Sequence, residues 1–229
     1  MGLIYDPSTT GRLKLGLNES VGILDIAPGL WIWRGRHPFW REGDDWQPVV
    51  TSTFVEAGNE RYVLDPVSPV FDNIGLWERL DKKPPTTAVC LMPDHVRDID
   101  LFIRHYNARG YGPMLFFPDD MPKSKLEPII ADKELPGGIM PLYDGRGRLE
   151  TPMWLPKHRT IIFGDALTER GGELRVWDSR GGHEKRELPA LRAMLDLPFE
   201  RVVISHCDKE PVHSRAEFEK ALKRLPWKG

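Results

Sequence analysis

Four short apolar runs in this chain each lead into aspartate or histidine. The residues that follow them are Asp65, the pair Asp94 and His95, Asp165, and His206. Loops after strand ends usually present the chemistry of an α/β fold, because the sheet fixes their position. Each residue alone could be a turn aspartate or a hydrogen-bonded histidine. The four together favour a functional site at one edge of a sheet.

The most informative of these ends is the stretch Cys90–Asp98. It lies between the apolar run 86–89 and a helical pattern that begins at Val96, so we expect a strand-to-helix loop. Pro93 disfavours a helical conformation for the residue before it. Adjacent side chains in a loop can converge on one ion, and a carboxylate beside an imidazole is half of a plausible zinc or iron site.

Hydrophobic periodicity predicts many short strands and few helices. We expect strands near residues 13–17, 22–27, 30–34, 49–56, 61–65, 86–89, 114–117, 137–143, 150–155, 159–163, 174–177 and 201–205. We expect helices over residues 74–80, 96–108, 188–195 and 214–225. Gly110 is expected to end the second helix, Ser214 and Glu217 to form a capping box, and His158 to lie exposed at a hairpin tip. The aromatic loop 36–47 is either a packed surface loop or a flap over a cleft.

Composition limits the function classes. The 229 residues are 40% hydrophobic, which supports a sizeable core, and we expect one domain over residues 1–229. The formal charge of −2 implies no general attraction to nucleic acid or to an anionic membrane. The chain has no apolar run of ~20 residues and no signal peptide, so the expected location is the cytoplasm. Two cysteines do not make a disulfide framework.

The order and spacing of the motifs resemble the metallo-β-lactamase superfamily, from about Leu30 to Leu222. Residues 53–65 resemble the paired strands that lead to the family's first aspartate. Residues 90–95 take the place of its His-x-His-x-Asp-His motif, and residues 163–167 that of the motif with the bridging aspartate. Residues 204–206 resemble its last histidine motif, and Gly145-Arg146 falls at its third histidine motif. The resemblance implies an α/β fold of the α+β kind, a four-layer αββα sandwich.

The sequence departs from the family at the first of its two metal sites. The three histidine positions of that site read Cys90, Met92 and Arg146. A thiolate can bind zinc, but methionine is a poor zinc ligand and arginine stays protonated. The resemblance implies that the second metal would be held by Asp94, His95, Asp165 and His206, all of which are present. Two imidazoles and two carboxylates suit zinc, and also iron or manganese.

Three further roles follow from this reading. Arg146 would place a fixed positive charge where the first metal is missing, either to hold an anionic substrate oxygen or to pair with Asp94 or Asp165. Asp65 matches the family residue that tethers the ligand loop. Cys90 and Cys207 could offer a thiolate or form a labile disulfide, although packing is the favoured role for an unpaired cysteine.

Two function hypotheses remain. The first is a hydrolase that uses one divalent metal, with Asp94 as ligand and orienting group, against an ester, thioester, amide or phosphoester of a small substrate, including an anionic one. The second is a non-catalytic relic, without metal, that binds a small molecule or a protein through the old cleft. Nucleic-acid processing is disfavoured because the chain has no basic stripe, and the sequence leaves the oligomeric state open.

Overall fold

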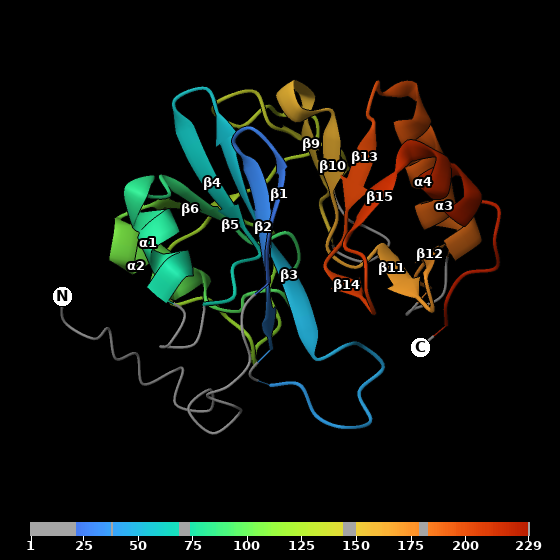
Figure 1. Ribbon diagram of the computed structural model, residues 1–229, viewed down its shortest axis with the longest axis horizontal. Coiled ribbons are helices and arrows are strands. Elements are labelled where there is room, and N and C mark those ends of the chain that lie inside the picture. The colour runs from blue at the N-terminus through green and yellow to red at the C-terminus, as the bar shows by residue number, and fades with distance from the viewer. Residues whose placement is uncertain (1–21, 38, 69–73, 144–149, 179–182, 229) are drawn as a thin grey trace.

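In the computed structural model the strands form two sheets, which lie between two pairs of helices. The structure describes residues 22–37, 39–68, 74–143, 150–178 and 183–228. Helices α1 (Ile74–Lys82) and α2 (Ile99–Tyr106) cover one sheet, and α3 (Leu188–Ala193) and α4 (Arg215–Ala221) cover the other (Figure 1). The order of layers is therefore helix, sheet, sheet, helix, as expected for an αββα sandwich.

The larger sheet has ten strands and the smaller has five. The larger contains β1 (Gly22–Ala27), β2 (Leu30–Arg36), β3 (Val49–Ala57), β4 (Glu60–Leu64), β5 (Thr87–Val89), β6 (Arg109–Gly112), β7 (Glu127–Pro128), β11 (Leu167–Arg170), β12 (Glu173–Val176) and β14 (His206–Cys207). The smaller contains β8 (Met140–Pro141), β9 (Met153–Leu155), β10 (Thr160–Ile162), β13 (Arg201–Val203) and β15 (Val212–Ser214).

Parallel pairs bring the predicted motifs to common edges. Strands β4 and β5 are parallel neighbours, so the loops after Leu64 and Val89 leave the larger sheet side by side. Strands β10 and β13 are parallel neighbours in the smaller sheet, so the segments after Ile162 and Val203 also leave together. The two sets of loops meet where the edges of the sheets adjoin, and this is where the site is built.

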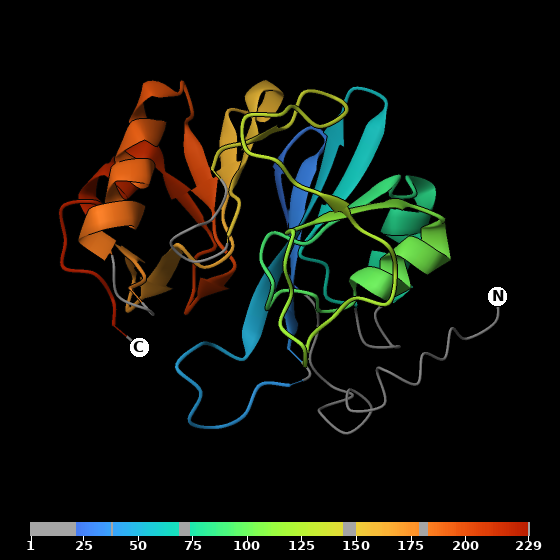
Figure 2. The same ribbon diagram turned by 180° about the vertical axis from the view of Figure 1, so that it is seen from behind.

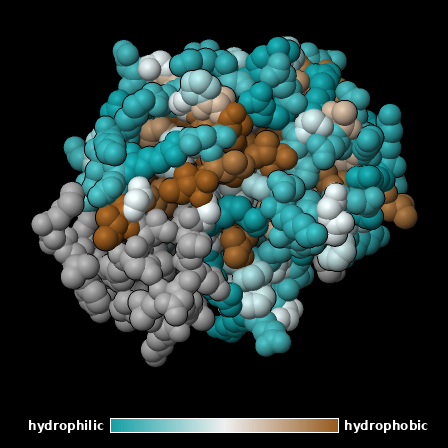
Figure 3. Space-filling model, viewed as in Figure 1, coloured by the Kyte–Doolittle hydropathy of each residue, from teal (hydrophilic) through white to brown (hydrophobic). Residues whose placement is uncertain are grey.

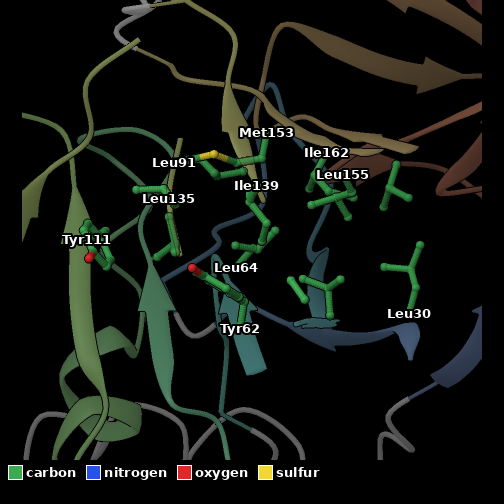
Figure 4. Close-up of a cluster of buried hydrophobic side chains, with 14 of the residues drawn as sticks. Leu30, Tyr62, Leu64, Leu91, Tyr111, Leu135, Ile139, Met153, Leu155 and Ile162 are labelled. Carbon is green, nitrogen blue, oxygen red and sulfur yellow. The ribbon is translucent and has the colours of Figure 1, made fainter. Parts of the chain in front are cut away.

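Three apolar clusters fill the three interfaces between the four layers. The cluster between the sheets contains Tyr62, Leu64, Met153 and Ile162 (Figure 4). Trp33, Phe54, Leu76 and Phe102 belong to the cluster between the larger sheet and α1 and α2. Phe163, Leu191, Phe199 and Phe218 belong to the cluster beneath α3 and α4. Burial of both faces of each sheet accounts for the nearly continuous apolar runs in the sequence.

The predicted strands 49–56 and 61–65 pair as a hairpin, and so do the predicted strands 150–155 and 159–163. The four helices and the capping box are also confirmed, with small shifts at the ends of the elements. Ser214 and Glu217 cap α4 reciprocally. Helix α2 is shorter than predicted: it begins at Ile99, because Arg97 has a left-handed backbone (φ 45°) that no helix interior allows.

Two predictions around the end of α2 are wrong. The helix ends at Asn107, whose φ is 51°, and not at Gly110. Gly110 lies in β6, where an added Cβ would stand 2.4 Å from Leu126 and 2.7 Å from Ile103. Close packing of the strand thus requires this glycine. The predicted strand 114–117 does not form, and Met114 and Leu115 are exposed in the connection that follows β6. That connection runs across the face seen in Figure 2.

The edge strand β1 exposes Ile23 and Leu24. It pairs only with β2 among the described strands, and apolar surface is visible on the face of the molecule where β1 lies (Figure 3). The predicted strand near residues 13–17 lies outside the described residues. No described helix is long and apolar enough to cross a membrane.

Candidate metal centre

Three of the four predicted ligands converge. His95, Asp165 and His206 are buried, and one ligand atom from each lies within 4.8 Å of the others. Nε2 of His95 is 3.0 Å from Oδ1 of Asp165, and Nε2 of His206 is 3.2 Å from the same oxygen. His95 comes from the loop after β5, Asp165 from the turn after β10 and His206 from β14. One carboxylate oxygen, from the turn after a strand of the smaller sheet, thus lies close to two imidazoles that the larger sheet carries.

Asp65 orients His95. One oxygen of its carboxylate lies 2.6 Å from Nδ1 of His95, and the other accepts the backbone N–H of Leu91 at 2.7 Å. Asp65 is buried and has a positive φ of 45°. The carboxylate fixes both the imidazole and the loop that carries it, which is the tethering position implied by the resemblance.

Glu150 builds the turn that carries Asp165, and sequence reasoning missed it. Its side chain is fully buried and accepts the N–H groups of Gly164 at 2.7 Å, Asp165 at 2.9 Å and Ala166 at 2.6 Å. A Cβ on Gly164 would lie 3.2 Å from Sδ of Met92 and 3.5 Å from Cε1 of His95. The glycine allows the turn to lie close against the ligand loop. Only the acidic character of Glu150, just before an apolar run, was visible in the sequence.

Arg97 is the second residue that sequence reasoning missed. Its Nη1 donates to the carbonyls of Thr51 at 3.1 Å and Asp65 at 2.9 Å, and its Nη2 donates to the Ser205 hydroxyl at 2.6 Å. The guanidinium therefore joins the ligand loop to β3, to the end of β4 and to the segment before His206. The helical spacing predicted Arg97 on a helix, whereas it lies before α2 with a left-handed backbone and its side chain bonds to β3 and to the segment before His206.

The two imidazoles have opposite electrostatic environments. Burial and the Arg97 charge lower the pKa of His95, but the carboxylates of Asp165 and Asp65 outweigh them and raise it to about 10. Burial lowers the pKa of His206 to about 4, against the attraction of Asp165. Burial would raise the pKa of Asp165, yet the charges of His95 and His206 hold it well below its ordinary value. Without a metal, the proton on His95 balances the two carboxylates.

Asp94 does not join this group of three. Its side chain is exposed, although it follows the buried residues 90–93 directly. Burial raises the pKa of the half-buried Asp120, and the charge of Asp94 adds to this effect. Asp120, in the connection after β6, is thus a neighbouring carboxylate that the sequence did not indicate. The roles of Asp94 as ligand and orienting group remain predictions.

The structure describes two of the three positions that match the family's first metal site, Cys90 and Met92. Cys90 and Met92 are buried, and the Cys90 thiol contacts the carbonyl oxygen of Met92 at 2.9 Å. Cys207 is also buried, and both cysteines are free thiols, in agreement with the packing role. Arg146 lies outside the described residues, so its predicted role stays a prediction.

The burial of His158 contradicts its predicted position at an exposed hairpin tip. His158 is buried rather than exposed, because the turn Pro156–His158 folds its ring toward β3, where Nε2 donates to the Glu56 carbonyl at 3.1 Å.

The loop between β2 and β3 projects from one end of the sheet (Figure 1). Its tip exposes Phe39, while Gln47 is buried and Trp46 packs edge-on against His206, with ring centroids 5.5 Å apart.

The three convergent residues fit a divalent metal. Ligand atoms around a tetrahedral ion with bonds of about 2.1 Å stand about 3.4 Å apart. The N–O contacts of 3.0 and 3.2 Å are close to this spacing. Two imidazoles and one carboxylate form a common three-ligand set for catalytic zinc, which leaves a fourth position for water or substrate. The buried Nδ1 of His206 has no hydrogen-bond partner among the described residues.

Solved structures with this architecture are numerous, although no family model and no curated protein matches the sequence. A metallo-β-lactamase from Hirschia baltica is 14% identical and superposes with a TM-score of 0.66 over 90% of this chain and 97% of its own. One from Pontibacter korlensis is 15% identical, with a TM-score of 0.65 over 90% and 100%. FIM-1 from Pseudomonas aeruginosa, in its mono-zinc form, is 17% identical, with a TM-score of 0.63 over 89% and 93%. This chain therefore has the metallo-β-lactamase fold, with a candidate metal-binding triad of His95, Asp165 and His206.

Proposed function

We propose that this protein is a hydrolase that uses a single divalent metal, zinc in the first place, held by His95, Asp165 and His206. The observation that carries the proposal is the convergence of these three buried side chains: both imidazoles lie against the same oxygen of Asp165, where the edges of the two sheets adjoin. A buried set of two imidazoles and one carboxylate in the metallo-β-lactamase fold is typical of a metal site.

In this proposal each residue of the site has a defined role in binding the metal or the substrate. His95, fixed by Asp65, and His206 would present neutral imidazoles, and Asp165, fixed by Glu150, would present its carboxylate. A bound metal would supply Lewis-acid polarisation of the scissile bond and activation of a water molecule. Asp94 and Asp120 would act at the rim, where an exposed and a half-buried carboxylate could orient water or select against highly anionic substrates. The substrate would be a small ester, thioester, amide or phosphoester.

The degenerate first site limits the reaction to one metal. Cys90 and Met92 are packed in the core, and the Cys90 thiol is engaged by a backbone carbonyl. Burial and the nearby charge of Asp65 raise the pKa of the Cys90 thiol well above its ordinary value, which disfavours the thiolate that zinc requires. The positive charge of Arg97, which acts to lower the pKa of His95, would take part of the role that a second cation would have.

One observation favours the rival function, a non-catalytic binding module. His95 lies between the carboxylates of Asp65 and Asp165 at 2.6 and 3.0 Å, so a protonated imidazole satisfies both without a metal. A relic could keep the group as a buried ion-pair network alone.

Metal analysis separates the two functions. We would measure the metal content of the purified protein by elemental analysis, beside the double variant His95→Ala/His206→Ala and the control His105→Ala, whose histidine lies on α2. About one metal ion per chain in the wild type and the control, lost in the double variant, supports the hydrolase. A screen of ester, thioester and phosphoester substrates would follow. Absence of metal after incubation with excess zinc would favour the binding module.

A further inference from the structure

His206 is held by aromatic rings rather than by a second hydrogen bond. Its ring contacts two tryptophans in T-shaped geometry, Trp46 at 5.5 Å between ring centroids with an interplanar angle of 84° and Trp177 at 5.6 Å with 78°. Ligand histidines usually donate their other ring nitrogen to a carboxylate or carbonyl, as His95 does to Asp65. Nδ1 of His206 has no such partner in the part of the chain that the structure describes. Edge-on packing of the two indoles therefore sets the orientation of this imidazole.

The two tryptophans come from different supports. Trp177 is buried directly after β12, and its backbone N–H donates to the carbonyl of Ala166, next to Asp165. Trp46 is half-buried near the end of the loop that joins β2 to β3. Trp177 is thus part of the rigid frame, whereas Trp46 reaches His206 from a projecting loop.

The end of that loop is anchored on the strands beside His206. Nε2 of Gln47 donates to Oδ1 of Asp208 at 2.8 Å and to the Glu169 carbonyl at 3.3 Å. Arg170 donates to the Asp45 carbonyl at 2.7 Å, and the Trp40 indole donates to the Trp46 carbonyl at 2.8 Å. These bonds hold Trp46 on both sides, while residues 41–45 remain exposed. The loop therefore holds the Trp46 indole in a fixed position against the candidate metal centre.

We infer that Trp46 is a positioning residue for the candidate metal centre: its indole fixes the ring of His206 and couples the conformation of the segment 39–48 to metal affinity. The inference rests on the proposed function, because it concerns the geometry of the same ligand. Trp46 acts through His206 and need not contact the substrate. A tilted or edge-on aromatic pair is favourable beyond the apolar area that it buries, so the contact with Trp46 selects one orientation of the His206 ring.

Cobalt provides the test, because Co²⁺ substitutes for zinc and its visible absorption reports ligand geometry. We would titrate the metal-free full chain with Co²⁺ and compare wild type with Trp46→Leu and Trp46→Phe. The matched control is Trp77→Leu, because Trp77 is also half-buried and lies edge-on to a histidine, His105, at 5.7 Å on the helical layer. Thermal unfolding of each metal-free variant would check that it folds.

The expected result is a loss of Co²⁺ affinity of about tenfold for Trp46→Leu, with a changed absorption spectrum, since residues that orient metal ligands typically contribute 10–100-fold. Trp46→Phe keeps an aromatic edge and should stay within about threefold of wild type, as should Trp77→Leu. Gln47→Met removes the hydrogen bonds of Gln47 to Asp208 and Glu169 but keeps the Trp46 indole, and it should lower Co²⁺ affinity about threefold. This variant replaces Trp46→Leu in the comparison if Trp46→Leu does not fold.

Three outcomes would overturn the inference, and they can be told apart. Equal Co²⁺ affinity and spectra for wild type, Trp46→Leu and Gln47→Met would show that the metal centre stands without this positioning residue. Equal losses in Trp46→Leu and Trp77→Leu, or in Trp46→Leu and Trp46→Phe, would also contradict a specific role of the aromatic edge. Failure of the wild-type protein to bind Co²⁺ would instead overturn the proposed function, and the inference with it.

Discussion

The carboxylate of Asp65 lies 2.6 Å from Nδ1 of His95 and determines which nitrogen faces Asp165. The same carboxylate accepts the Leu91 N–H, so it also fixes the backbone of the loop. A single side chain from one strand end thus controls both the direction of a candidate ligand and the position of the segment that carries it.

Asp65→Asn should weaken metal binding by about 10–100-fold, as is usual for residues that orient a ligand histidine. The amide offers one acceptor in place of two, so either His95 or Leu91 loses its partner. Competition with a chromophoric chelator would measure zinc affinity. Asp81→Asn is the matched control, because Asp81 accepts from Tyr106 and pairs with His105 on the helical layer. Equal affinities for wild type and Asp65→Asn would contradict the prediction.

Glu150→Gln should destabilise the fold by about 3 kcal/mol, since it places an amide N–H against buried backbone donors. The carboxylate accepts three N–H groups in a fully buried position, and the glutamine oxygen cannot replace both acceptors. Urea unfolding would measure the free-energy change. The exposed Glu134→Gln should shift it by less than about 0.5 kcal/mol. A similar small shift for Glu150→Gln would show that the turn is held by other contacts.

Gly164→Ala should reduce metal affinity by about tenfold, with less effect on stability than on binding. Its new Cβ would stand 3.2 Å from Sδ of Met92 and 3.5 Å from Cε1 of His95, so the ligand loop must move. Calorimetric zinc titration would measure the effect. Gly75→Ala, in α1 with nothing within 4 Å of the added Cβ, should bind as wild type and gain up to about 1 kcal/mol of stability. Unchanged zinc affinity in Gly164→Ala would refute the predicted crowding.

Both cysteine thiols should resist modification in the folded protein. Burial raises the pKa of Cys207 to about 12 and that of Cys90 well above its ordinary value, so neither forms a thiolate near neutral pH. A chromogenic disulfide reagent at pH 8 should therefore label no thiol in the native state and both after denaturation. Rapid labelling of one native thiol would place that cysteine at an accessible site.

The stability of the protein should fall with acidification below pH about 6.5, in part through His158. Burial lowers the pKa of His158 in the fold, against its bond to the Glu56 carbonyl, so the unfolded chain binds more protons in this range. The stabilisation by the neutral ring is present above pH about 6.5 and is lost as the pH falls through the lower folded value.

His158→Gln should flatten this dependence, at most by about 1.4 kcal/mol per pH unit. Urea unfolding of the wild type and the variant at several pH values would measure it. Parallel curves for the two proteins would exclude His158 as the group responsible.

The sequence by itself determined the layers of the fold, three candidate metal ligands that converge, and the aspartate that orients one of them. Apolar runs that end in Asp65, His95, Asp165 and His206 predicted strand ends at one edge, because period and turn chemistry are local properties of the chain. The resemblance to the metallo-β-lactamase superfamily then predicted the αββα sandwich, which the structure and its solved neighbours confirm. The predicted helix ends, the predicted strand 114–117 and the predicted exposure of His158 were wrong, because packing against distant parts of the chain determines these features.

Only the tertiary structure decided how the candidate ligands are held. Arg97 reaches Ser205 across 108 positions of the chain, and Gln47 reaches Asp208 across 161. Glu150 holds the turn of Asp165, and Trp46 orients His206, through contacts that no periodicity encodes. The exposure of Asp94 beside the buried His95 has the same origin, since neighbours in a loop point where the backbone turns them. Local patterns specify elements, whereas the partners of a buried polar group depend on which elements the fold brings together.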